Sequence, residues 1–234
     1  RQSPEVEAAL VAMDQHSGAV LALTGGYRFQ HSHFNRVTQA KRQPGSSFKP
    51  FIYAAALANG YTLASVIQDA PLVTADAVDQ QWRPQNDKKV FYGPTRLRVG
   101  LEKSLNTVTA RLLQAVGLPE TERYLRHLGF DKDAVPSDFT LALGSGDITP
   151  LDLTRGYAEI ANGGYAVTPH VIQSVTLSQS KDPTAPYAPL LACDACVASD
   201  QLAPRMITAD VSYLMDSALK GVILHGTGRA AKVL

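Results

Sequence analysis

The order of the sequence patterns predicts an α+β fold. Two short apolar runs near the N-terminus predict paired strands, the middle of the chain carries apolar residues at helical spacing, and a strand and a helix follow. Strands and helices do not alternate regularly, so a parallel sheet of βαβ units is not expected. With 234 residues, of which 45% are hydrophobic, the chain is long enough to bury a sizeable core.

The first 26 residues are expected to form a β-hairpin at the N-terminal edge of a sheet. The apolar runs VEAALVAM (residues 6–13) and AVLALT (residues 19–24) are joined by DQHSG, in which Asp14 and Gly18 are turn-forming residues. Gly25 and Gly26 end the second run. A polar stretch then leads into the helical part of the chain.

Residues 42–165 are expected to form a helix-rich part. A helix is predicted from Ser47 to about Ala58, and the segment 62–94 is expected to be irregular because turn-forming residues are frequent in it. Thr149-Pro150 predicts the start of another helix, which NGG (residues 162–164) ends. Between these helices, residues with helical spacing predict further helix: Leu97, Leu101, Leu105, Val108 and Leu112.

Residues 166–234 are expected to contain a strand, a loop insertion and a helix. TPHVIQSVTLS (residues 168–178) alternates between apolar and polar side chains, and residues 208–228 read as a long helix with a glycine-rich end. Cys193 and Cys196 lie in the insertion between them. Zinc would need two more ligands that no nearby Cys or His pair supplies, so a loop disulfide or two ordinary thiols is expected.

Charge and hydropathy exclude several classes of partner. The 22 basic and 21 acidic residues nearly cancel and are scattered, so attraction to nucleic acid or to an anionic membrane is not expected. The longest apolar runs are too short to span a bilayer. His31 and His33 are expected at the surface, and no cofactor or metal is predicted. The abrupt chain ends suggest a fragment, with any anchor or export signal outside it.

Ser46 and Lys49 form the first candidate for chemistry. They lie three residues apart at the expected start of a helix, where positions i and i+3 share a face. A serine is a poor nucleophile unless a neighbouring base takes its proton, and the N–H groups of a helix start favour a developing oxyanion. Taken alone, the spacing equally fits a helix cap and a solvated lysine. Ser47 does not share the spacing.

Ser104 and Asn106 form the second candidate. A second hydroxyl can relay a proton, and a carboxamide can both donate to and accept from a peptide group. In one regular helix these two residues would point to different faces, whereas at a helix break both could face a cleft. The pattern Ser-x-Asn is weak by itself.

Together, and in this order, the two motifs resemble those of penicillin-binding proteins and class A β-lactamases. The wider sequence resembles class A, bifunctional penicillin-binding proteins, in segments such as AALVAMDQHSGAVLALTGG, WRPQN and YGPTRLRVGLEKSLNTVTARLLQAVG. The segments LALGSGDITPLDLTRGYAEIANGGY and LMDSALKGVILHGTGRAA extend it, so that the resemblance runs from about residue 5 to residue 231. Only the segment around residues 178–204 has no clear counterpart in the family. The implied fold is that of the serine β-lactamase-like transpeptidases, a helical subdomain with an antiparallel sheet.

The resemblance implies a D,D-transpeptidase that cross-links peptidoglycan stem peptides at D-Ala-D-Ala and is acylated by β-lactams. Ser46 would be the nucleophile, Lys49 the base, Ser104 the relay to the leaving D-alanine, and Asn106 the group that holds the substrate amide. The Ser46 N–H would supply half of the oxyanion hole. The parent protein would be anchored at the periplasmic face of the inner membrane and would meet other cell-wall synthesis proteins.

Two departures from the family pattern stand out. The middle residue of the second motif is Leu105 and not Asp, which suits these synthases better than class A β-lactamases. The Lys-Thr-Gly motif is absent, and the family places it shortly after HGTGRAA. A chain without this strand is expected to be impaired or inactive in acylation. The glycosyltransferase domain and membrane helix of the family are also expected to lie outside this sequence.

Two alternative functions remain open at this point. A β-lactamase-type hydrolase would need a base that activates water, and Glu159 is the tempting candidate, although its helical setting fits a packed or solvent-facing residue better. A non-catalytic domain for binding or scaffolding in the cell-wall machinery would not need the four motif residues together. A penicillin adduct that is hydrolysed quickly would favour the hydrolase, and a long-lived adduct would favour the transpeptidase. Continuation of the gene into Lys-Thr-Gly would favour the transpeptidase over the non-catalytic domain.

Overall fold

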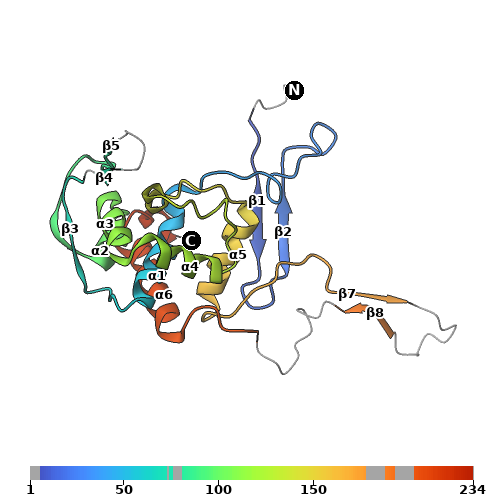
Figure 1. Ribbon diagram of the computed structural model, residues 1–234. Coiled ribbons are helices and arrows are strands. Elements are labelled where there is room, and N and C mark those ends of the chain that lie inside the picture. The colour runs from blue at the N-terminus through green and yellow to red at the C-terminus, as the bar shows by residue number, and fades with distance from the viewer. Residues whose placement is uncertain (1–5, 73, 76–80, 178–187, 193–202, 234) are drawn as a thin grey trace. The chain divides into compact units, whose positions relative to one another are not determined.

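The computed structural model of the chain describes residues 6–72, 74–75, 81–177, 188–192 and 203–233 (Figure 1). The chain divides into two compact units, each built from two separate stretches of sequence. The first unit comprises residues 1–40 and 149–206, and the second comprises residues 41–148 and 207–234. The expected segments 1–26, 42–165 and 166–234 follow chain order, whereas these units interleave. Cys193 and Cys196 lie outside the described residues.

The first unit contains the expected hairpin and the helix predicted at Thr149. Strand β1 (Leu10–Met13) pairs antiparallel with β2 (Val20–Thr24), and α5 (Pro150–Ala161) packs against β1. The Thr149 hydroxyl accepts a hydrogen bond from the Asp152 N–H at 3.1 Å, which confirms the predicted cap. Strands β7 (Ser174–Leu177) and β8 (Ala188–Ala192) form a second antiparallel pair. The observed strand β7 is shorter than the predicted one and covers only the C-terminal part of residues 168–178.

The second unit is built around α1 (Lys49–Ala58), in which every residue from Lys49 to Leu57 is buried. Its sequence KPFIYAAALA is almost entirely apolar, and a helix that is apolar all round is stable only when other elements cover every side. Here α3 (Asn106–Val116), α4 (Leu118–His127) and α6 (Ala209–Leu224) pack against it. Phe48, Phe51 and Phe130 meet at its start with ring centroids 4.8–5.3 Å apart.

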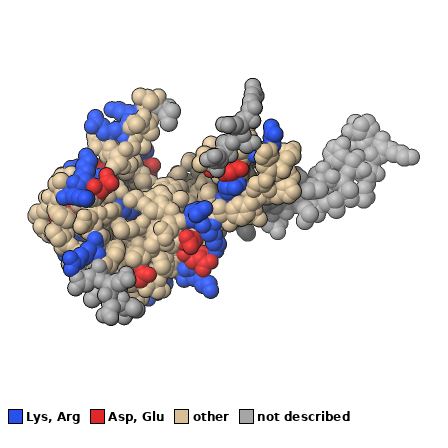
Figure 2. Space-filling model, turned by 90° about the horizontal axis from the view of Figure 1, so that it is seen from above, with Lys and Arg blue, Asp and Glu red and all other residues tan. Residues whose placement is uncertain are grey.

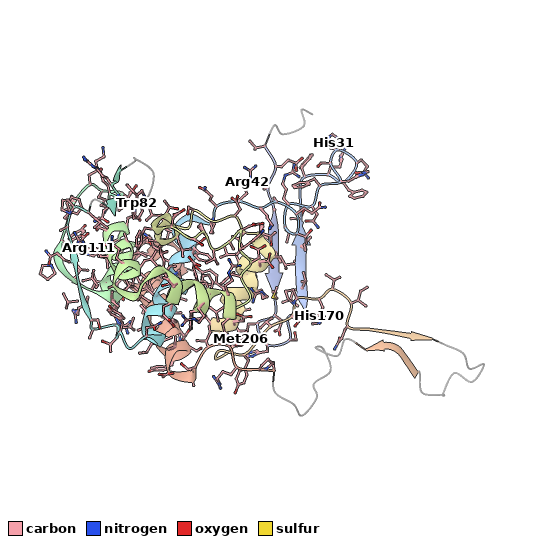
Figure 3. The ribbon with its side chains drawn as sticks, in the orientation of Figure 1. His31, Arg42, Trp82, Arg111, His170 and Met206 are labelled. Carbon is pink, nitrogen blue, oxygen red and sulfur yellow. The ribbon has the colours of Figure 1, made fainter. Side chains whose placement is uncertain are left out.

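The segment 62–94, expected to be irregular, contains ordered strands. Strand β3 (Val66–Asp69) pairs antiparallel with β6 (Gly93–Arg96), and β4 (Thr74–Ala75) pairs with β5 (Gln81–Trp82). The prediction was wrong here because the partner of each residue in β3 lies 24 to 30 positions away along the chain. Trp82 lies in β5, and Arg111 on α3 donates to the carbonyl of Pro71 at 2.9 Å (Figure 3).

The stretch with leucines at helical spacing is interrupted. Helix α2 (Leu97–Glu102) and α3 are separated by Lys103, Ser104 and Leu105. Ser104 has a φ of 54°, one of two positive values among the described non-glycine residues, and Leu105 is extended. The helical spacing of the leucines continues across this break, so periodicity alone could not reveal it. Ser104 and Asn106 could have lain in one regular helix or at a helix break, and the structure shows the break.

Candidate active site

Ser46 lies in a short 3-10 helix, Gly45–Phe48, that runs directly into α1. In a 3-10 helix the side chains at i and i+3 eclipse one another, which aligns Ser46 and Lys49 more closely than an α-helix would. The two side chains differ in environment, because Ser46 is exposed whereas Lys49 is only 1% exposed. An accessible hydroxyl therefore lies at the mouth of the helix, with a buried amine on the following turn.

The backbone before Ser46 is held by the LGSGD loop. The Gly45 N–H donates to the Gly144 carbonyl at 3.1 Å, and Gly144 has a φ of 69°. A Cβ at Gly144 would lie 2.1 Å from the Gly45 carbonyl oxygen, so only glycine permits this approach. The glycines of this loop, Gly144 and Gly146, lie a few residues before the start of α5. Their contact with the turn that carries Ser46 was not predicted, because it joins residues about 100 positions apart.

The Lys49 side chain ends among three oxygen acceptors. Its Nζ donates to the Ser104 carbonyl at 2.7 Å, to the Ser104 hydroxyl at 3.0 Å and to Asn106 Oδ1 at 2.6 Å. These three contacts match the three N–H donors of an ammonium group. All three acceptors are neutral, and burial lowers the pKa of Lys49 to about 8. The amine form is therefore far more accessible near neutral pH than for an exposed lysine.

Only one of the three acceptors can reverse its role when Lys49 is neutral. A neutral amine has two N–H donors and one lone pair, so one contact must then carry a hydrogen toward Nζ. The Ser104 carbonyl and Asn106 Oδ1 only accept, whereas the Ser104 hydroxyl can also donate. Ser104 is therefore the group beside Lys49 through which a proton can pass.

Asn106 is the first residue of α3 and is anchored on three sides. Its Nδ2 donates to the Gln85 carbonyl at 2.7 Å, which turns Oδ1 toward Lys49, and its backbone N–H donates to Asn86 Oδ1 at 2.8 Å. One lone pair of Oδ1 and one hydrogen of Nδ2 remain beyond these contacts. The Asn106 carboxamide could therefore still donate one hydrogen bond to a peptide group and accept one from it.

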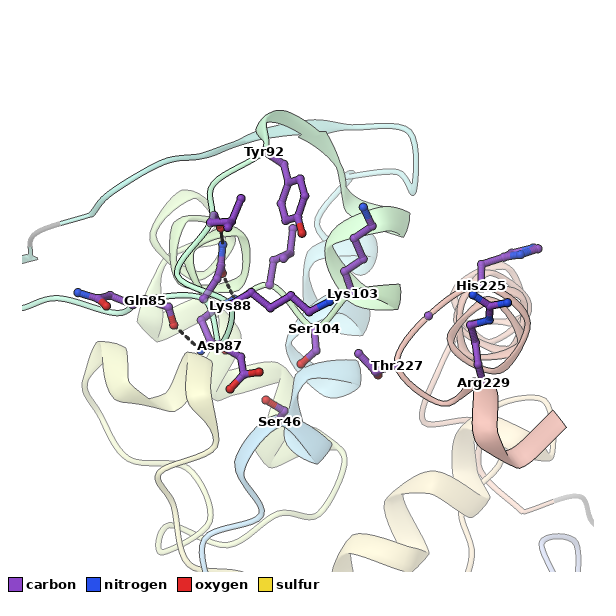
Figure 4. Close-up of a pocket in the computed structure, with 15 residues that line it drawn as sticks. Ser46, Gln85, Asp87, Lys88, Tyr92, Lys103, Ser104, His225, Thr227 and Arg229 are labelled. Atoms are coloured by element: carbon purple, nitrogen blue, oxygen red, sulfur yellow. Dashed lines mark hydrogen bonds between the residues drawn. The ribbon is translucent and has the colours of Figure 1, made fainter. Parts of the chain in front are cut away.

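Ser46, Ser104 and Asn106 line one open pocket of about 930 Å³ in the second unit. Figure 4 shows Ser46 and Ser104 pointing into it, and Lys88 extending toward Ser104. Its wall also includes the residues that follow α6, since the Thr227 N–H donates to the Glu102 carbonyl at 3.1 Å. The remaining lining residues are Gln85, Asn86, Asp87, Val90, Tyr92, Lys103, Leu105, His225, Gly226 and Arg229.

Three of these lining residues are basic and one is acidic. They are Lys88, Lys103 and Arg229 against Asp87. Elsewhere, on the face seen in Figure 2, basic side chains lie in several separate groups and do not form a stripe. His225, which lies in the glycine-rich end of the segment predicted as a helix over residues 208–228, is part of the pocket wall.

The other candidates from the sequence lie apart from this set. Glu159 belongs to the first unit, is 2% exposed and forms an ion pair with Arg155 at 2.6 Å. His31 and His33 are exposed, and His33 stacks on Phe29 at 4.3 Å. Within the described residues, no three His, Cys, Asp or Glu side chains are grouped so that they could hold a metal ion. No described helix is long and apolar enough to cross a membrane.

Sequence reasoning missed the residues that support the pocket from behind. Gln85 and Asn86 bind Asn106, and Asp69 binds Asn86. In the sequence, Gln85 and Asn86 stand out only through WRPQN and the family resemblance, and Asp69 lies in a segment rich in turn-forming residues. No spacing rule connects positions 69, 86 and 106, so only a family comparison could have singled them out.

Comparison with known proteins confirms the sequence resemblance over nearly the whole chain. Residues 8–233 match the family model of the penicillin binding protein transpeptidase domain. Penicillin-binding protein 1A of Pseudomonas aeruginosa is 40% identical over 271 residues, which cover 100% of this chain and 33% of that protein. The same-named protein of Vibrio cholerae is 49% identical over 175 residues, 74% of this chain and 21% of that protein. The chain thus spans a third or less of these relatives.

Solved structures agree with the sequence comparison. Penicillin-binding protein 1A from Haemophilus influenzae superposes with a TM-score of 0.83 at 36% identity, covering 97% of this chain and 36% of that one. Penicillin-binding protein A from Mycobacterium tuberculosis, in its imipenem acyl-enzyme complex, shares the fold with a TM-score of 0.75 at 20% identity, covering 96% of this chain and 59% of that one. These likenesses confirm the predicted α+β fold. Since the family model covers residues 8–233, the chain belongs to the penicillin binding protein transpeptidase domain family.

Proposed function

We propose that the chain is the D,D-transpeptidase domain of a peptidoglycan synthase and works through an acyl-enzyme on Ser46. One observation carries the proposal: Lys49 is buried, uses all its donors on neutral acceptors, and lies one turn from an exposed Ser46. Burial of the amine and the lowered pKa suit it to take a proton near neutral pH.

The proposed reaction has two acyl transfers. Ser46 Oγ attacks the carbonyl carbon between two terminal D-alanines, and its proton passes to Lys49 Nζ. The C–N bond to the last D-alanine breaks, and the leaving amine takes a proton through the Ser104 hydroxyl. An amine of a second stem peptide then attacks the ester, gives up a proton along the same groups, and releases Ser46 as the new amide forms. Dividing the exchange in this way avoids a single difficult step.

Asn106 and the start of α1 have supporting roles in this proposal. The lone pair and hydrogen that remain on the Asn106 carboxamide would hold the peptide group next to the attacked carbonyl. The backbone N–H of Ser46 would supply one donor to the developing oxyanion. A β-lactam carries a strained amide that Ser46 would open to form a stable ester. We place the parent protein at the periplasmic face of the inner membrane, with other cell-wall synthesis proteins as partners.

Acylation by a fluorescent penicillin tests the proposal. The protein as its gene encodes it is expected to be labelled with one adduct per chain, located at Ser46 by peptide mass spectrometry. Ser46→Ala should reduce labelling at least about 1,000-fold. Ser47→Ala is the matched control: its hydroxyl donates to the Pro44 carbonyl at 2.6 Å, so we expect a loss of no more than a few-fold. Equal labelling of wild type and Ser46→Ala would contradict the proposal.

The lifetime of the adduct separates the proposal from the two alternatives. A transpeptidase should keep the penicilloyl ester for many minutes, whereas a β-lactamase-type hydrolase should release it within seconds. Glu159, the candidate base of such a hydrolase, is bound to Arg155, which leaves it poorly placed to activate water. A folded protein that takes no label at all would support the non-catalytic alternative.

A further inference from the structure

A buried polar network lies behind the pocket wall, and Asp69 is at its centre. Asp69 ends strand β3 and is 1% exposed. Its carboxylate accepts from Asn86 Nδ2 at 2.9 and 3.1 Å, from the Tyr92 N–H at 2.8 Å and from the Thr107 hydroxyl. No salt bridge to Asp69 is seen among the described residues. Burying a carboxylate costs free energy unless hydrogen-bond donors surround it. Moving any of these donors away would restore that cost, so the carboxylate holds them in place.

Asn86 connects this carboxylate to the active site. It is 4% exposed, and its Nδ2 is used by Asp69 and by the Val90 carbonyl at 2.9 Å. Because Nδ2 faces the carboxylate, Oδ1 must face the opposite way, toward the start of α3. There it accepts from the Asn106 N–H at 2.8 Å and more weakly from the Thr107 N–H at 3.4 Å.

These bonds replace the cap that α3 does not have in its own sequence. The first N–H groups of a helix have no partner within the helix, and Leu105 at the N-cap position has no side-chain oxygen to offer. Asn86 supplies that oxygen from a segment 20 residues upstream. Gln85, its neighbour, binds the Asn106 side chain at the same time. One short segment thus fixes both the backbone and the carboxamide of Asn106.

We infer that Asp69 and Asn86 are positioning residues for the proposed acylation, acting through Asn106 on Lys49. Three hydrogen bonds in series join the Asp69 carboxylate to the Lys49 amine: Asn86 to Asp69, Asn106 to Asn86, and Lys49 to Asn106. Neither Asp69 nor Asn86 contacts Lys49 or Ser46 in these bonds. Their contribution is to keep Asn106 Oδ1 against the amine and to keep water away from it.

The inference rests on the proposed function and is tested by exchanging the two side chains. Asp69→Asn places two carboxamides face to face, and Asn86→Asp places two carboxylates face to face. Each single variant is expected to lower the penicillin acylation rate constant about 10- to 100-fold, the scale of a small misplacement of reacting groups. The double variant Asp69→Asn/Asn86→Asp restores one donor and one acceptor in reverse order. Its acylation rate constant should be at least tenfold higher than the two single losses combined would give. Such non-additivity is expected only of residues that contact each other.

A second measurement does not depend on acylation. The titration of Lys49 can be followed by NMR of lysine-labelled protein and assigned with Lys49→Met. In Asp69→Asn and Asn86→Asp, water should reach the amine, and its midpoint should rise toward the ordinary value. Asn86→Asp also adds a carboxylate, which raises the midpoint by charge alone. Asp69→Asn removes a carboxylate, so a rise in that variant is the decisive one. Asn59→Asp, at the exposed end of α1, is the control and should leave the midpoint and the acylation rate constant unchanged.

The outcomes separate this inference from the proposed function. If the single variants lose only the fraction of folded protein, with the rate constant per folded molecule and the Lys49 midpoint unchanged, the pair is structural and the inference is wrong. It is also wrong if the double variant shows no recovery. If wild type takes no label at Ser46 while the midpoint still shifts in the single variants, the proposed function fails and the positioning of Lys49 by this pair stands.

Discussion

Lys49 and Glu159 are both buried ionisable side chains on helices, one in each unit, yet their surroundings differ. Glu159 is 2% exposed and lies 2.6 Å from Arg155, one helical turn away. Lys49 is 1% exposed and meets three neutral oxygens, with no salt bridge to it among the described residues. Burial shifts both pKa values toward neutrality, to about 7 for Glu159 and about 8 for Lys49.

The difference shows why a shifted pKa alone does not identify a catalytic group. The partner of Glu159 is a cation with no proton to exchange at neutral pH, and the pair lies within one helix. One partner of Lys49 is a hydroxyl that can both donate and accept, and an exposed serine lies on the preceding turn. We therefore expect chemistry at Lys49 and a packing role for Glu159.

The largest expected effect is on the acylation rate, when the ionisable groups of Lys49 and Glu159 are replaced one at a time. Lys49→Met should lower the penicillin acylation rate about 1,000-fold, because no base then takes the Ser46 proton. Lys49→Arg should fail similarly, since guanidinium does not lose its proton at accessible pH. Glu159→Gln should stay within about threefold of wild type. Stopped-flow acylation kinetics on folded protein measure all three, and a loss with Glu159→Gln as large as with Lys49→Met would remove the distinction.

A smaller effect is expected from pH. Lys49 must be neutral to accept a proton, and with a pKa of about 8 the neutral fraction rises about tenfold between pH 7 and pH 9. The acylation rate should rise by that factor and then level off, in both wild type and Glu159→Gln. A stable β-lactam should be used so that its own hydrolysis does not interfere. A rate that is flat from pH 7 to pH 9 would contradict the role of Lys49 as the base.

A third effect is on stability rather than on rate, and it concerns Glu159. Burial raises its pKa above the ordinary value of 4.5, so the folded protein keeps a proton that the unfolded chain has lost. The stability gained in this way is fully present below about pH 4.5 and is lost as the pH rises through about 7, by at most about 3 kcal/mol. Glu159→Gln should lack this loss. Urea unfolding of both proteins from pH 5 to pH 7.5 measures the difference, and parallel curves would mean that Glu159 is ionised throughout.

The helices of this protein were predictable where local signals were strong. The apolar sequence of α1, the Thr149-Pro150 start of α5 and its stop at NGG appear in the structure near their predicted positions. Strands β3 and β6 were missed, because their pairing joins residues 24 to 30 positions apart and leaves no periodic signal. The break at Ser104 was left open, because the leucine spacing continues across it.

The sequence by itself determined the composition of the proposed site: Ser46 and Lys49 at a helix start, then Ser104 and Asn106 in the family order. Tertiary structure decided how these residues work together. The helix break turns Ser104 and Asn106 toward Lys49, the packing around α1 removes water from the amine, and Gly144 and Asn86 hold the two walls from distant segments. The physical reason is that burial and hydrogen bonding depend on which segments meet in space, and local sequence patterns do not encode those meetings.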